Sequence, residues 1–176
     1  ILLIIIIGTF LLLAIASWII LRPGSFPMAL ERGPVSQIGN LYFGPYPTDD
    51  EFTKLKKIGI KRIVSLLDER IPYEHILLNR EKELAEKFHM EFNNFPMASL
   101  FDHHLFSDYQ FQAKEAVDIL LQYSTEMIYI HCYLGKHRTQ FIRNEISKRK
   151  GLVIEPLLPL SDEDILKYKD AEKQIP

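Results

Sequence analysis

Cysteine is almost absent from this 176-residue sequence, in which Cys132 is the one thiol. A single thiol excludes an internal disulfide and a zinc site built from several cysteines. An excess of either charge is also missing, because 21 basic and 23 acidic side chains leave a formal net charge of -2. That balance gives no electrostatic reason to expect nucleic acid as a partner. Internal repeats and low-complexity tracts are absent too, so nothing indicates a repeat protein.

Charge is missing altogether from residues 1–21, which are almost wholly apolar. About 20 such residues cross a bilayer as a helix, so this segment is predicted to be a single-pass transmembrane anchor in the membrane. A cleaved signal peptide is the alternative, since residues 14–16 fit a small-x-small cleavage pattern. The apolar run continues beyond that pattern to Leu21, which favours the anchor. Arg22 and Arg32 favour a cytoplasmic position for the domain that follows, as does a lone thiol, which persists best in a reducing compartment.

The rest of the chain divides into a linker at residues 22–35, a domain at 36–150 and a tail at 151–176. Proline and glycine are frequent in the linker. Predicted strands occupy residues 37–43, 60–67, 90–97 and 127–131, and predicted helices occupy residues 48–58, 72–88, 107–123 and 138–149. This alternation predicts an α/β fold with a mostly parallel central sheet that is flanked by helices on both faces.

The residues around the end of the last predicted strand are the most informative about the reaction that this protein could catalyse. Cys132 stands six positions before Arg138, with Gly135 between them and Thr139 directly after. A loop that runs into a helix N-terminus directs several backbone N–H groups to one point, and the helix dipole adds partial positive charge there. Such a site favours both a phosphate and an ionised sulfur, and the planar fork of an arginine can bind two phosphate oxygens. The pattern therefore predicts a thiolate nucleophile in a phosphate-binding loop, whereas a buried core thiol would not require the arginine and the loop.

A family resemblance rests on the nine residues His131-Cys132-Tyr133-Leu134-Gly135-Lys136-His137-Arg138-Thr139. They resemble the signature loop of the cysteine-dependent protein tyrosine phosphatase superfamily, most of all its plant-and-fungal-type atypical dual-specificity phosphatases. Residues 39–47 and 55–64 are similar to the opening strand and the first helix–strand unit of that family. The likeness covers residues 36–150, the predicted phosphatase domain, and departs at Gln140, where the family usually has glycine. It implies a protein tyrosine or dual-specificity phosphatase-like fold.

The resemblance implies an enzyme that hydrolyses phosphomonoesters through a cysteinyl-phosphate intermediate. Cys132 is then the nucleophile, Arg138 opposes the charge of the transferred group, and the Thr139 hydroxyl eases release of the sulfur. In related phosphatases the proton donor is an aspartate on a separate upstream loop, which places Asp102 in that role. Asp108 is the rival, although it lies just inside a predicted helix start, where acidic residues commonly complement the dipole. His131 is expected to brace the loop.

The predicted substrate contacts come from the whole loop, namely Tyr133, Leu134, Gly135, Lys136, His137, Arg138 and Thr139. Lys136 and His137 add cationic groups that suit a ligand with more than one phosphate. The resemblance implies inositol polyphosphates or pyrophosphates as candidates beside phosphoproteins, and a membrane anchor adds phospholipid headgroups.

No cofactor or metal is expected. His103 and His104 are adjacent, and adjacent residues rarely converge on one ion without further ligands. Two other functions remain open. A catalytically weak phosphate-binding pseudophosphatase module is the first. It is suggested because two aspartates compete for the role of the general acid and because Gln140 replaces the glycine that is usual in the family. A rhodanese-like sulfur transferase also uses a loop cysteine, but the long spacing to Arg138 and the upstream similarity argue against it.

Overall fold

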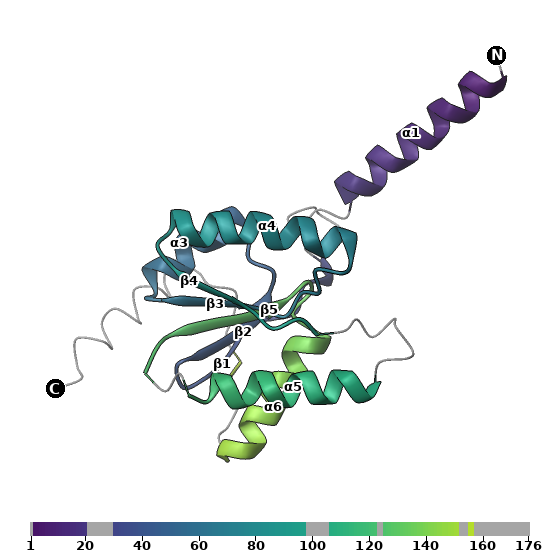
Figure 1. The fold of residues 1–176 in the computed structure, drawn as a ribbon. Coiled ribbons are helices and arrows are strands. Elements are labelled where there is room, and N and C mark those ends of the chain that lie inside the picture. Colours follow the sequence, from purple (N-terminus) through teal and green to yellow (C-terminus); the bar gives the residue numbers. More distant parts are fainter. Residues whose placement is uncertain (1, 21–29, 98–105, 123–124, 152–154, 157–176) are drawn as a thin grey trace. The chain divides into compact units, whose positions relative to one another are not determined.

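The computed structural model describes residues 2–20, 30–97, 106–122, 125–151 and 155–156 (Figure 1). The chain forms two compact units, residues 1–32 and residues 33–176. The boundary falls inside the predicted linker, so each unit can be described by itself.

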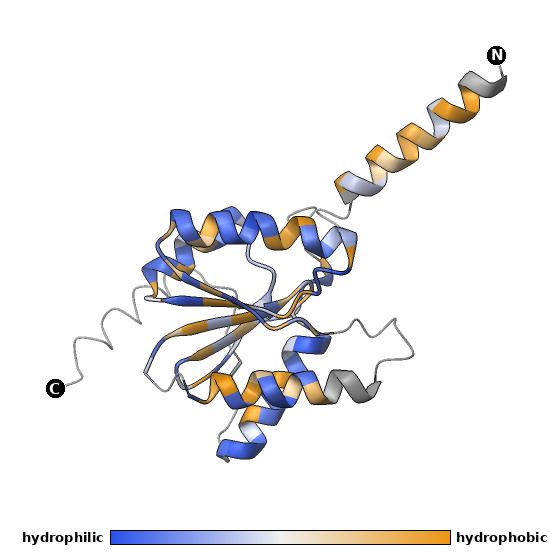
Figure 2. Ribbon diagram, in the orientation of Figure 1, coloured by the Kyte–Doolittle hydropathy of each residue, from blue (hydrophilic) through white to orange (hydrophobic). Residues whose placement is uncertain are grey.

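The first unit contains one helix, α1 (Leu2–Ile20). Figure 2 shows hydrophobic residues along most of its length. Large apolar side chains such as Phe10, Leu12 and Trp18 are more than half exposed. Within the described residues, no helix combines the length and the hydropathy of a membrane span. The transmembrane prediction for residues 1–21 is therefore not confirmed.

In the second unit, six strands of the described residues form one mixed sheet in the order β4-β3-β5-β2-β1-β6. Their bounds are β1 (Ser36–Ile38), β2 (Leu41–Pro45), β3 (Arg62–Ser65), β4 (Glu91–Asn94), β5 (Ile128–Cys132) and β6 (Glu155–Pro156). The pairs β2–β5, β5–β3 and β3–β4 are parallel, whereas β1 pairs antiparallel with β2 and β6. Strands β2 and β5 are buried along their whole length, as expected of parallel strands covered on both faces. The predicted α/β fold with a mostly parallel centre is confirmed.

Helices cover both faces of this sheet (Figure 1). Their bounds are α3 (Asp49–Lys57), α4 (Pro72–Lys87), α5 (Phe106–Leu120) and α6 (His137–Lys150). The apolar stripes of α3 and α4 pack on one face with the side chains of Ile63 and Tyr129. Those of α5 and α6 pack on the other face with Ile128, Ile130 and Cys132. Successive residues of a strand point to opposite faces, so His131 lies on the α4 side and Cys132 on the α6 side.

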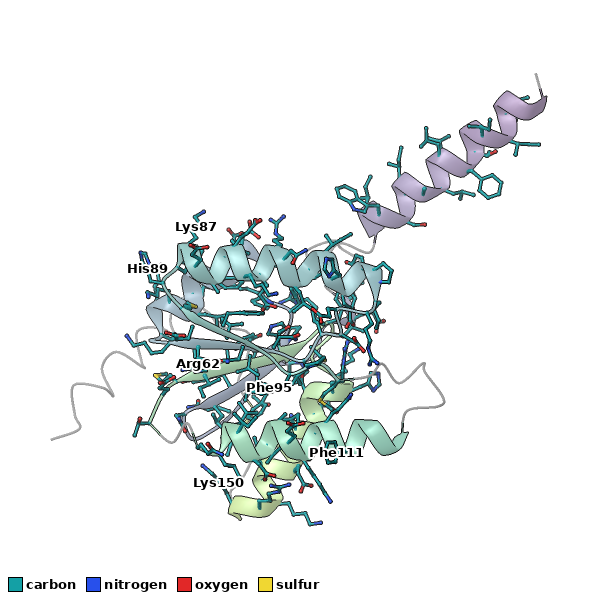
Figure 3. The ribbon with its side chains drawn as sticks, in the orientation of Figure 1. Arg62, Lys87, His89, Phe95, Phe111 and Lys150 are labelled. Carbon is teal, nitrogen blue, oxygen red and sulfur yellow. The ribbon has the colours of Figure 1, made fainter. Side chains whose placement is uncertain are left out.

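Two features differ from the predictions. The predicted strand at residues 37–43 is a hairpin of β1 and β2, because Gly39 (φ +57°) and Asn40 form a turn that reverses the chain. The apolar pattern of the helix predicted at residues 107–123 places Phe111, Val117 and Leu120 on its buried face. Val117 and Leu120 do join the core, but Phe111 is 70% exposed on α5 (Figure 3). A short helix that the sequence also predicts after Ser161 lies outside the described residues.

Candidate active site

The phosphate loop begins where β5 ends. Cys132 is the last residue of β5, and it lies at the carboxyl end of a central parallel strand with Pro45 of β2 as its register partner. Ligands bind at such strand ends in α/β proteins. The chain re-enters helix at His137, so the loop leads directly into the N-terminus of α6. The side chain of Cys132 is 3% exposed and packs against the core below the loop.

Backbone carbonyls of the loop are bonded to the surrounding segments. The N–H of Tyr46 donates to the Tyr133 carbonyl at 3.1 Å, and the N–H of Gly33 donates to the Leu134 carbonyl at 2.7 Å. In a trans peptide the carbonyl and the following N–H point in opposite directions, and no described peptide bond is cis. The N–H groups of Leu134 and Gly135 therefore point away from these neighbours and toward the inside of the loop, where an oxyanion can accept from them.

Gly135 is the tightest point of the loop. Its φ of +69° lies in the left-handed region, and a Cβ there would come within 2.4 Å of the Pro45 nitrogen and 2.5 Å of the Gly44 carbonyl carbon. Gly135 thus allows the loop and β2 to approach each other at backbone distance. Gly44 leaves room for a side chain instead, because a Cβ there would lie 2.2 Å from the Tyr129 hydroxyl oxygen.

Arg138 is held by a carboxylate that the sequence analysis missed. Its Nη1 donates to Glu74 Oε2 at 2.9 Å, and its Nη2 donates to Glu74 Oε1. Nη1 also donates to the carbonyls of Leu66 at 3.0 Å and Met97 at 3.2 Å. Both charged side chains are about nine-tenths buried. A buried guanidinium with several fixed acceptors has little freedom, so the orientation of Arg138 is set before any substrate binds.

The loop that follows β3 contains a second carboxylate near the site. The N–H of Asp68 donates to Glu74 Oε2 at 2.6 Å, and the Asp68 carboxylate accepts from Arg70 at 2.6 to 3.1 Å. The hydrogen bonds from Arg70, and more weakly the charge of Arg138, hold the pKa of Asp68 below its ordinary value against the opposing effect of burial. A lowered pKa favours the ionised carboxylate, which suits an acceptor for the Arg70 guanidinium.

The remaining loop side chains differ in exposure. Thr139 is buried, and its hydroxyl has no hydrogen-bond partner within the described part of the chain. His137 is exposed, whereas Leu134 and Lys136 are partly buried. Tyr133 packs edge to face on Tyr73 of α4, with their hydroxyl oxygens 3.2 Å apart. All the predicted loop residues lie in the described part of the chain, between the end of β5 and the first turn of α6.

The two candidate acids cannot be placed relative to Cys132. Asp102 lies at residues 98–105, outside the described residues, and the side chain of Asp108 on α5 is not described either. The chain enters that segment from Met97, whose carbonyl accepts from Arg138. His103 and His104 also lie outside the described residues. Among the residues that the structure does describe, no group of three or more metal-ligating side chains converges.

His131 is fully buried and contacts a second glutamate of α4, Glu81, through its Nε2. The sequence analysis missed Glu74 and Glu81, but their spacing could have revealed them. Both fall in the 3–4 periodicity of the buried stripe of α4, which also includes Leu77 and Leu84. An acidic residue at a core position of an amphipathic helix indicates a buried partner of opposite charge.

Comparison with solved structures agrees with this fold. The chain resembles a DUF442 protein from Shewanella putrefaciens CN-32, with a TM-score of 0.52 and 15% identity over 70% of this chain and 73% of that one. It also resembles a kinase-associated phosphatase whose catalytic-site cysteine is replaced by serine, with a TM-score of 0.51 and 14% identity over 78% of this chain and 82% of that one. At such identities the likeness establishes the fold alone. No curated protein matches the sequence significantly.

The sequence itself settles the family. The model of the tyrosine phosphatase family matches residues 27–145, well over half of the chain, and this stretch contains the whole loop from Cys132 to Thr139. The match does not distinguish the narrower plant-and-fungal-type group within this family, so that part of the prediction is not confirmed. With its fold and its loop geometry in agreement, the chain belongs to the tyrosine phosphatase family.

Proposed function

We propose that this protein is a membrane-anchored, cysteine-dependent phosphatase that hydrolyses phosphomonoesters through a cysteinyl-phosphate intermediate. One observation supports it above the others: buried Cys132 begins a loop in which the N–H groups of Leu134 and Gly135 point away from the neighbouring segments, and the buried guanidinium of Arg138 follows six positions later. Amides, guanidinium and helix N-terminus all favour negative charge at one point. The narrower placement among plant-and-fungal-type atypical dual-specificity phosphatases is part of this proposal.

The reaction has two steps. In the first, the Cys132 thiolate forms a bond to phosphorus while the bond from phosphorus to the leaving oxygen breaks, and Asp102 gives its proton to that oxygen. In the second, water attacks phosphorus, the sulfur–phosphorus bond breaks, and Asp102 takes the proton of the water. The Thr139 hydroxyl donates to the departing sulfur, which is consistent with a buried hydroxyl that has no partner among the described residues. Asp108 remains the rival for the role of Asp102.

The contact with Glu74 fixes the orientation of Arg138. Its Nη1 and Nη2 both donate to the Glu74 carboxylate, and pre-orientation of this kind lowers the reorganisation needed in the transition state.

The proposed substrates carry more than one anionic group. Lys136 and the exposed His137 lie at the start of α6 beside the inner amides of the loop, which suits phosphoproteins, inositol polyphosphates or phospholipid headgroups. The membrane part of the proposal rests on residues 1–21, which lack charge, and on helix α1 (Leu2–Ile20) within them, which has large exposed apolar side chains. Arg22 and Arg32 favour a cytoplasmic catalytic domain.

Phosphate release by the full chain in detergent, with EDTA present, tests the proposal. A panel of phosphopeptides, inositol polyphosphates and phospholipid headgroups is expected to include a substrate that is hydrolysed without added metal. Cys132→Ser is expected to abolish release while still binding that substrate, because the loop amides and Arg138 remain. Turnover retained in this variant would contradict the proposed nucleophile.

Two further variants show whether Asp102 or Asp108 is the general acid. Asp102→Asn is expected to lower kcat by roughly 10²- to 10⁴-fold, the usual size of a general-acid contribution, and Asp108→Asn is expected to have little effect.

A rapid-quench trace decides between the enzyme and the pseudophosphatase module. Release of at least one phosphate per molecule supports the enzyme, whereas oxyanion binding with no release supports the module.

A further inference from the structure

The first residue of the second unit lies directly against the phosphate loop. This residue is Gly33, which is buried. Its N–H donates to the Leu134 carbonyl at 2.7 Å, at the short end of the normal range for a bond between backbone groups. The reaction proposed above gives this contact no role.

A side chain at position 33 would separate the two segments. A Cβ there would lie 2.9 Å from the Gly135 carbonyl oxygen, 3.1 Å from the Leu134 carbonyl oxygen and 3.2 Å from the Gly135 carbonyl carbon. All three are backbone atoms of the loop, which cannot turn aside as the end of a flexible side chain can. Glycine at position 33 therefore lets the chain come close enough for its N–H to reach the loop.

The residues that follow Gly33 are fixed to the rest of the domain. Ser36 opens β1, is the register partner of Phe43 in β2 and is 3% exposed. Its hydroxyl accepts from Nη1 of Arg143 on α6 at 3.1 Å. Val35 packs against the core on the α3 and α4 side of the sheet. Gly33 is thus held beside the loop by the chain that follows as well as by its own hydrogen bond.

The hydrogen bond from Gly33 sets the direction of one amide of the loop. The Leu134 carbonyl and the Gly135 N–H belong to the same peptide unit, and in a trans peptide they point in opposite directions. A carbonyl that is held by Gly33 therefore turns the Gly135 N–H away from Gly33. Rotation of this peptide would replace an N–H donor by a carbonyl oxygen, whose partial negative charge repels an oxyanion.

We propose that Gly33 is a positioning residue for the oxyanion-binding amides of the phosphate loop, and that it acts through the Leu134–Gly135 peptide. The inference rests on the proposed function for its importance in catalysis, but not for its physical basis. A residue of the predicted linker at residues 22–35 then supports the active site, because it supplies the donor that orients the loop.

Tungstate binding tests the proposal, because this tetrahedral oxyanion uses the loop amides but needs no turnover. The full chain in detergent is compared with Gly33→Ala by calorimetry. The dissociation constant is expected to rise at least about tenfold, the least that one hydrogen bond to a charged group contributes. Tungstate bound by folded Gly33→Ala as tightly as by the wild type would overturn the proposal.

Val35→Ala is the matched control for a loss of stability in the same segment. It removes packing against the core but leaves the Gly33 N–H and the space beside it unchanged. Both variants are expected to unfold at a lower urea concentration than the wild type, and only Gly33→Ala is expected to bind tungstate more weakly. Equally weakened binding in the two variants would overturn the proposal, because it would follow stability alone.

Hydrogen exchange in the wild-type chain gives a test that needs no variant. When an oxyanion occupies the loop, the Gly33–Leu134 bond opens only after the oxyanion leaves, so tungstate at ten times its dissociation constant is expected to slow exchange of the Gly33 N–H about tenfold. The His89 N–H, which donates to the Glu86 carbonyl beyond the end of α4, is the control and is expected to exchange at an unchanged rate. Should Gly33→Ala fail to fold, this measurement decides alone, and an unchanged rate at Gly33 overturns the proposal.

Neither measurement requires a substrate, so this test and that of the proposed function fail separately. Weaker tungstate binding by Gly33→Ala of a protein that releases no phosphate supports the role of Gly33 and contradicts the phosphatase. Phosphate release with unchanged tungstate binding supports the phosphatase and contradicts the role of Gly33.

Discussion

At the scale of single residues, Gly135 lets the loop backbone approach β2 more closely than any side chain would allow. Its φ is +69°, and a Cβ added to it would lie 2.4 Å from the Pro45 nitrogen. Strain from the positive φ is about 1 to 2 kcal/mol for a residue other than glycine, and the close approach requires the backbone itself to move. The geometry of the loop therefore depends on the absence of one methyl group.

Gly135→Ala is expected to lower the free energy of unfolding by at least about 2 kcal/mol and to abolish phosphate release. Urea unfolding and a phosphate-release assay measure the two effects. Gly39→Ala is the matched control, because Gly39 also has a positive φ of +57° but no atom within 4 Å of the added Cβ. It is expected to lose only about 1 kcal/mol and to keep its activity. Equal losses in both variants would show that the close approach has no role.

At the scale of elements, α4 combines a packing face with two buried carboxylates. Leu77 and Leu84 join the core, while Glu74 and Glu81 lie on the same stripe and bind groups at the two ends of the phosphate loop. A buried carboxyl group that loses its partner is strongly unfavourable. The position of α4 and the shape of the loop are therefore coupled.

Glu74→Gln leaves the Arg138 guanidinium buried without its counter-ion. We expect a loss of about 3 kcal/mol in the free energy of unfolding, typical of a broken buried pair, and a drop in kcat of at least tenfold because the arginine loses its orientation. Glu86→Gln on the exposed side of α4 serves as the control and is expected to change neither quantity. An unchanged kcat in folded Glu74→Gln would contradict the positioning of Arg138 by this helix.

The loop after β3 predicts a pH dependence of stability. Arg70 lowers the pKa of Asp68 below 3.8 in the folded state, so the folded protein prefers the ionised carboxylate more than the unfolded chain does. The stabilisation is complete above that ordinary value and is lost as the pH falls through the lower folded value. The difference in unfolding free energy between wild type and Asp68→Asn is expected to be constant near pH 6 and to shrink below about pH 4. A difference that grows toward acid pH would show that the sign is wrong.

At the scale of the whole molecule, the two units differ in whether their apolar side chains are buried or exposed to solvent. The second unit buries its apolar side chains in a sheet covered on both faces. The first leaves residues such as Leu11, Leu12 and Phe10 more than half exposed on α1. Exposed apolar side chains of this number are unfavourable in water, which supports the proposed anchor.

Vesicle flotation tests the anchor. The full chain is expected to float with phospholipid vesicles, and Leu11→Arg with Leu12→Arg is expected to prevent this, since each arginine at a helix centre costs about 2.5 to 3.5 kcal/mol on insertion scales. Leu30→Arg, which adds charge outside the apolar segment, is the control and should still float. A protein that stays with the aqueous fraction in every case would refute the anchor.

Local sequence was enough to predict most of the elements and the loop. The predicted helices at 72–88 and 138–149 agree with α4 (Pro72–Lys87) and α6 (His137–Lys150), because proline at the first turn, apolar periodicity and a terminal Gly151 are local features. The roles of Cys132 and Arg138 were predicted for the same reason, because the two residues lie only six positions apart in the sequence. The hairpin was missed although Gly39-Asn40 is itself a local signal, since a Gly-Asn pair between two strand-like stretches is typical of a two-residue hairpin turn.

The pairing of distant groups around the site, in contrast, came from the packing of the folded chain. Glu74 and Glu81 lie 64 and 50 residues before their partners Arg138 and His131 (138 − 74 and 131 − 81), and no local pattern encodes a pairing at that range. It arises because the parallel order β3-β5-β2 places α4 over the carboxyl end of β5. Burial there removes water as a competing partner, so each charge must be compensated by a side chain that the fold supplies.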